Sequence, residues 1–137
     1  MKPNVMLTIA SLLLLLFLTF HLADDIARGF EPGGLSNLVV TVLISVVWLY
    51  GTLVLAGRRS GYIIMLVASI VGTGVPILHM AGKGLAGGRI APNSSGAFFW
   101  VWQNFTLCVI SLFTVILSVS RLWSLPWRRP RQSNIQT

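Results

Sequence analysis

The stretch Val5–Ala23, VMLTIASLLLLLFLTFHLA, contains no Asp, Glu, Lys or Arg. A helix that crosses the hydrocarbon core of a bilayer needs about 20 consecutive, mostly apolar residues. Three further stretches meet this requirement, at residues 38–56, 62–80 and 97–117. Together they predict an all-α fold, a polytopic membrane protein built as a bundle of four transmembrane helices.

The composition supports this class. Of the 137 residues, 55% are hydrophobic and 9% are charged, whereas an average soluble domain carries about 25% charged residues. We expect residues 1–120 to form one transmembrane domain. Residues 121–137 should form a cytoplasmic tail that is basic, anchored by aromatic residues and disordered at its end.

The first apolar stretch has a second interpretation. A basic residue, Lys2, followed by an apolar run also describes a signal peptide. The run is long for such a segment, and cleavage after Ala23 would place His21 where a small residue is needed. We favour an uncleaved helix and leave cleavage open.

Basic residues predict the orientation, because lysine and arginine accumulate on the cytoplasmic side of a membrane protein. With four spans, one side carries Lys2, Arg58, Arg59, Arg121, Arg128, Arg129 and Arg131, and the other carries Arg28, Lys83 and Arg89. The richer side should be cytoplasmic, so both termini lie inside (N-in, C-in). We expect a bacterial inner (plasma) membrane.

The net charge of +7 does not predict a nucleic-acid partner, because the basic residues lie at helix ends and in the tail. Arginine contributes about 1 kcal/mol of attraction to an anionic membrane surface. The tail should therefore bind anionic lipid headgroups through Arg121, Trp123, Trp127, Arg128, Arg129 and Arg131. A homo-oligomer or a larger membrane complex is also compatible with the sequence.

Residues 62–80 carry small residues four apart, Ala68 with Gly72 and Ser69 with Thr73. Small residues at this spacing allow membrane helices to approach closely. Pro76 follows two glycines and predicts a kink in this helix.

No metalloprotease, serine-hydrolase, phosphate-binding or Cys-x-x-Cys motif is present, so we favour a protein that is not an enzyme. No charged residue lies in the middle of a predicted span, and this disfavours a proton-coupled transporter. A channel or an oligomeric transporter remains an alternative. Acid–base chemistry by the acids near His21 at the headgroup level is another.

The two histidines of the chain, His21 and His79, end the first and third spans, which run in the same direction. With a rise of about 1.5 Å per residue, they should lie at nearly the same depth. Asp25 is four residues from His21 and shares its helix face, and Asp24 could substitute for it. An outward-facing pocket should form here from His21, Asp24, Asp25, His79, Trp100, Gln103 and Asn104.

Three interpretations of this group stay open. His21, Asp25 and His79 suit a divalent metal such as zinc or copper. The two histidines could instead be axial ligands of a haem b. They could also cap helix ends and bond to the neighbouring acids. We favour a small non-enzymatic membrane protein, either an accessory subunit or a protein that binds a small ligand or lipid, with metal or haem binding as the alternative.

Overall fold

The computed structural model describes residues 3–81 and 96–125, and every regular element in these ranges is a helix. Its helices are α1 (Pro3–Ala27), α2 (Leu35–Leu49), a short π-helix η1 (Tyr50–Val54) that continues α2, α3 (Arg59–Ala81) and α4 (Ala97–Ser124). With α2 and η1 counted as one run, four helices are long and apolar enough to cross a membrane. The predicted all-α, four-helix class is confirmed.

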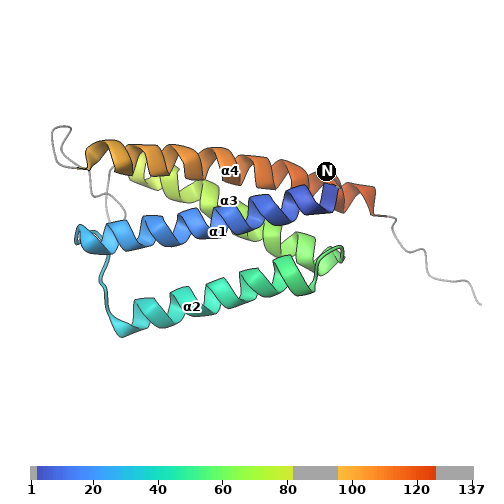
Figure 1. Cartoon of the computed structure of the whole chain (residues 1–137), viewed down its shortest axis with the longest axis horizontal. Coiled ribbons are helices and arrows are strands. Elements are labelled where there is room, and N and C mark those ends of the chain that lie inside the picture. Colours follow the sequence, from blue (N-terminus) through green and yellow to red (C-terminus); the bar gives the residue numbers. More distant parts are fainter. Residues whose placement is uncertain (1–2, 82–95, 126–137) are drawn as a thin grey trace, which may run out of the picture.

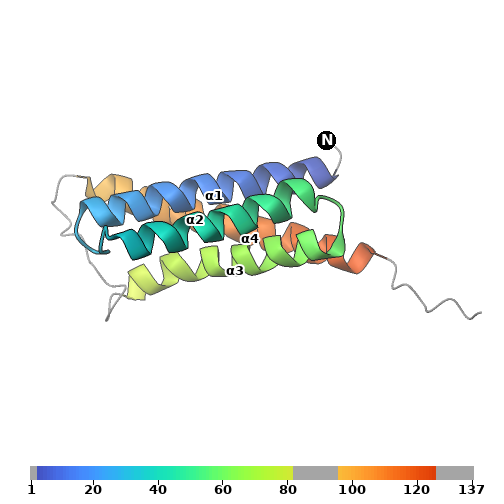
Figure 2. The same ribbon diagram turned by 90° about the horizontal axis from the view of Figure 1, so that it is seen from below.

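The four helices do not pack equally closely against one another. Helix α4 packs along both α1 and α3, whereas α2 lies on the opposite side of this pair (Figures 1 and 2). The first residue of α1 and the last of α4 lie at one end, here named the terminal end (Figure 1). At the other end α1 and α3 finish and α2 and α4 begin. We name it the histidine end, because His21 and His79 lie towards it.

The distribution of polarity is inverted relative to a soluble protein. Large apolar side chains such as Ile116 and Val67 are more than half exposed. Among the described residues, more of the buried side chains are polar or charged than apolar; the polar set is Ser11, His21, Asp25, Thr52, Ser69, His79, Gln103, Asn104, Ser111, Thr114 and Ser118. In water, roughly the reverse is expected, because apolar burial drives folding. An apolar exterior of this kind suits contact with lipid chains.

Small residues on α3 bring the main helices together, as their spacing predicts. A Cβ at Gly72 would lie 3.2 Å from Leu14 of α1 and 3.5 Å from Ser111 of α4. One residue on, the Thr73 hydroxyl donates to Ser111 Oγ at 3.0 Å. Helix α3 runs through Pro76 without interruption, and the predicted kink there stays a prediction.

Two helices continue beyond their predicted ends. Helix α1 reaches Ala27 rather than Ala23, and Arg28 just after it pairs with Asp24 one turn earlier. Helix α4 continues past residue 117 to Ser124, so the first part of the predicted tail is helical. Leu122 lies in this extension and packs against a buried cluster at the terminal end, which explains why the helix does not stop earlier.

Several predicted elements lie outside the described residues. They are Lys83 and Arg89 between the third and fourth spans, Lys2 at the start of the chain, and the tail residues Trp127, Arg128, Arg129 and Arg131. Of the predicted anchor, Arg121 and Trp123 belong to α4, and Trp123 is 87% exposed.

Helix α2 is held firmly only towards the terminal end. Trp48 is its one buried residue, and Trp48 Nε1 donates to Ser11 Oγ of α1 at 2.9 Å. Ser11 Oγ in turn shares a 2.8 Å hydrogen bond with Thr52 Oγ1 in η1. Gly61 at the start of α3 approaches η1 so closely that a Cβ would collide with the carbonyl oxygens of Leu55 and Gly51. Towards the histidine end, α2 leaves a cleft against α1 and α3.

Candidate metal site

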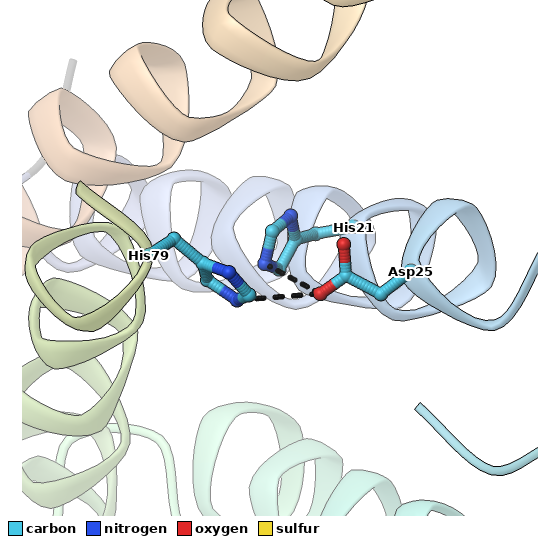
Figure 3. Close-up of side chains that lie close together, drawn as sticks. All are labelled: His21, Asp25 and His79. Atoms are coloured by element: carbon cyan, nitrogen blue, oxygen red, sulfur yellow. Dashed lines mark ion pairs between the residues drawn. The ribbon is translucent and has the colours of Figure 1, made fainter. Parts of the chain in front are cut away.

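One turn of α1 and the last turn of α3 supply three ionisable side chains to a single point. His21 and Asp25 lie four residues apart on α1, the spacing that places side chains on one helix face. His79 reaches them from α3 (Figure 3). All three are nearly buried, with 3%, 2% and 7% of their surface exposed.

A single carboxylate oxygen is the focus of the group. Asp25 Oδ2 lies 3.3 Å from His21 Nε2 and 3.3 Å from His79 Nε2. Figure 3 shows both imidazole rings directed at this oxygen from different helices. One candidate ligand atom from each residue lies within 4.8 Å of the other two.

These separations suit a small ion. Zinc is bound at about 2.0–2.2 Å by imidazole nitrogen and carboxylate oxygen, so adjacent ligands of a tetrahedral ion lie about 3.3–3.6 Å apart. The two nitrogen–oxygen distances in the group, both 3.3 Å, fall at this value. Two imidazoles with one carboxylate form a donor set that divalent zinc and copper both accept. The described atoms could hold such an ion.

The same geometry disfavours a haem. Two axial histidines must lie on opposite faces of the porphyrin, which then separates them. Here the rings of His21 and His79 are in edge-to-face contact, with centroids 4.7 Å apart and planes at 85°. Asp25 Oδ2 also lies close to both Nε2 atoms. Because no porphyrin plane fits between rings in contact, an ion fits the group better than haem b.

Helix α4 covers the group from the side opposite α2. The Trp100 ring meets His79 edge to face, with centroids 5.7 Å apart. Gln103 and Asn104 follow on the buried face of α4. Among the described residues, no hydrogen-bond partner is present for the buried atoms His21 Nδ1, His79 Nδ1, Asp25 Oδ1, Trp100 Nε1, Gln103 Oε1 and Asn104 Oδ1. Buried polar atoms are normally paired, so this end of the interior has capacity for further polar contacts.

Asp24 does not join the group, although the sequence allows it to substitute for Asp25. Its Oδ2 accepts a hydrogen bond from Arg28 Nε at 2.8 Å. Arg28 also reaches the carbonyl of Gly96, just before α4, at 3.4 Å. Asp24 therefore belongs to a contact between helix ends, and Asp25 is the carboxylate that faces the histidines.

A cleft of about 250 Å³ between α1, α2 and α3 is bordered by all three members of the group. Its far wall carries Asn37, Thr41 and Ser45, which recur every four residues along one face of α2. Glu31 also lines it, from the loop before α2. Of the predicted pocket residues, Asp24, Trp100, Gln103 and Asn104 do not line this cleft.

The polar face of α2 was not predicted from the sequence. A polar residue every fourth position in an otherwise Val-, Leu- and Ile-rich helix is the signal that could have identified it.

No family model matches the chain, and neither a curated protein nor a solved structure matches it. The class must therefore come from the fold and the site themselves. They define an all-helical protein with four helices long and apolar enough to span a membrane, and with a buried His–Asp–His group that could hold a metal.

Proposed function

We propose that this protein is an integral membrane protein that binds one divalent transition-metal ion through His21, Asp25 and His79. The observation that carries the proposal is the convergence of two imidazole nitrogens on one carboxylate oxygen, each at 3.3 Å, from two separate helices. Zinc is the first choice because these distances match a tetrahedral edge. Copper is the competing ion, since it binds nitrogen and oxygen donors more tightly in general.

The membrane assignment rests on the inverted polarity. A buried ionisable group within an apolar span is costly and is normally paired and functional. Asp25 lies within the apolar helix Asn4–Ala27 and has two histidines as its close neighbours. The bundle is proposed to lie in a bacterial-type inner membrane with both termini inside, so that the histidine end faces outward. Arg121 and Trp123 would then meet the inner headgroups.

Metal content of the purified protein tests the first proposal. Protein in mild detergent is stripped with chelator, given one equivalent of zinc or copper, desalted, and analysed by native mass spectrometry and elemental analysis. We expect one ion per chain, and at least a tenfold loss of retention in His21→Gln and in His79→Gln. Trp100→Phe, which changes a ring neighbour but removes no metal donor, should keep the ion. Folded protein that retains neither ion, or equal retention in all variants, contradicts the proposal.

Accessibility of two serines tests the orientation. Ser36 lies at the start of α2 and Ser60 at the start of α3, at opposite ends of the bundle, and both are exposed. Cys108, the one cysteine of the chain, is first replaced by alanine. In this background, Ser36→Cys should react with a membrane-impermeant thiol reagent added to intact cells. Ser60→Cys should react only after permeabilisation. The opposite pattern would reverse the topology without affecting the metal site.

A further inference from the structure

The cleft beside the histidines has two chemically different walls. The wall formed by α1 and α3 carries all three residues of the candidate metal site, His21, Asp25 and His79. On the α2 wall the polar side chains are the amide of Asn37 and the hydroxyls of Thr41 and Ser45, which lie among apolar residues such as Val40 and Ile44; Leu35–Leu49 contains no His, Cys, Asp or Glu. The metal-ligating side chains therefore lie on one side of the cleft.

The polar side chains of the α2 wall are held in place by the local backbone. Asn37 Nδ2 donates to the carbonyl of Pro32 at 2.9 Å, and the Thr41 hydroxyl donates to the carbonyl of Asn37 at 2.7 Å. The remaining donor and acceptor groups of these two side chains are available to water in the cleft. Polar side chains on both walls, set among apolar ones, make this cleft suitable for water or a small ligand with a polar end.

A zinc ion with four protein ligands is closed to other molecules, whereas one with three protein ligands keeps a fourth position for water or substrate. Among the described residues, the group of donors within 4.8 Å has three members. Of the described residues that line the cleft, Glu31 is the only other one with a carboxylate, and it is not a member of that group.

Resting on the metal site proposed above, we infer that the bound ion keeps its fourth coordination position open to the cleft. That position accepts water or a small, monodentate nitrogen or oxygen ligand. An ion of charge +2 beside the Asp25 carboxylate retains a net positive charge, which favours anionic and strongly polar donors. The volume sets the size of the ligand. At about 250 Å³ the cleft is smaller than the roughly 300–1,000 Å³ pockets that take drug-sized molecules.

Cobalt(II) provides the test, because it replaces zinc in such sites and its visible absorption changes with its ligands. The protein is loaded with one equivalent of cobalt and desalted, and is then titrated with azide and separately with imidazole. We expect a saturable spectral change that fits one probe molecule per ion, with cobalt still bound by elemental analysis.

Two variants connect the spectral change to the cleft. Thr41→Leu places a larger apolar side chain in the α2 wall and should weaken probe binding at least tenfold while cobalt stays bound. Val42→Leu is the matched control, since Val42 is 51% exposed on the outer face of the same helix. It should bind the probes like the unmodified protein. Equal weakening in both variants would show that the probes do not bind in the cleft.

The outcomes separate this inference from the metal proposal. Cobalt that binds with unmodified affinity but shows no response to either probe overturns the open position and leaves the metal site intact. If the unmodified protein does not respond and Glu31→Gln does, Glu31 is the fourth ligand and the site is closed, which also overturns the inference. Failure to retain any of cobalt, zinc and copper contradicts the metal site itself.

Discussion

Replacing Asp25 with asparagine changes the charge at the centre of the site and almost nothing else. The side chains have the same shape, and Asp25 is 2% exposed, so neither a cavity nor a new surface results. In the folded protein the amide can still place an oxygen between the two Nε2 atoms that lie 3.3 Å from Asp25 Oδ2. An effect of Asp25→Asn on metal binding therefore reports the ligand charge.

The size of this effect follows from the position of the oxygen. Mutating a group that only orients a ligand typically costs 10–100-fold in metal affinity. Asp25 would contact the ion directly, so its loss should cost at least about 100-fold. At about 1.4 kcal/mol per factor of ten, that is about 2.8 kcal/mol or more of binding free energy.

Asp24→Asn is the matched control on the neighbouring residue. It removes the same charge from the same turn of α1, but the Asp24 carboxylate is already paired with Arg28 at 2.8 Å. Screening and the pairing should limit its effect on zinc affinity to less than about threefold. Competition against a chromophoric chelator in detergent measures both affinities. Equal losses in the two variants, or no loss in Asp25→Asn, would refute the assignment of Asp25 as a ligand.

Two predictions concern the bundle rather than the ion. Ser11→Ala removes the acceptor of the buried Trp48 N–H and should destabilise the bundle by about 1 kcal/mol, the range of buried hydrogen bonds in water and in membranes. Thr8→Ala, which removes an exposed hydroxyl from the same helix, should leave the thermal unfolding temperature in detergent nearly unchanged. At Gly72 even a Cβ would lie only 3.2 Å from the Leu14 side chain, so Gly72→Val should overpack this contact and lower the stability of the bundle by about 1–3 kcal/mol. Gly74→Ala, with open space around its Cβ, should be neutral or stabilising, and equal effects at both glycines would contradict this packing.

The fold could be predicted because length and hydropathy are properties of local sequence. Four apolar runs near the required length were enough to count the helices. The shared depth of His21 and His79 could also be predicted, because two helices that run in the same direction through one membrane place their final turns at one level. These arguments need no knowledge of which helices are neighbours.

The choice between Asp24 and Asp25 could not be made in that way. Successive residues differ by about 100° around a helix, so each aspartate faces a different neighbour. The choice depends on the rotation of α1 within the bundle and on Arg28, which pairs with Asp24. The cleft could not be predicted either, because it depends on how η1 holds α2 at one end, and the residues Tyr50–Val54 carry no recognised pattern for a π-helix.

The energetic position of Asp25 is the strongest reason to expect an ion at this site. Burying a carboxylate costs free energy unless it is paired with a positive charge and its remaining lone pairs accept hydrogen bonds. Here Oδ2 has the two Nε2 atoms at 3.3 Å, a long separation for a charge-assisted hydrogen bond, which is typically about 2.7–2.9 Å. Oδ1 has no partner among the described residues. An ion between the three donors would replace two long contacts with three short bonds and supply the positive charge that the buried carboxylate lacks. It would also join α1 to α3, so metal removal should loosen the histidine end in particular.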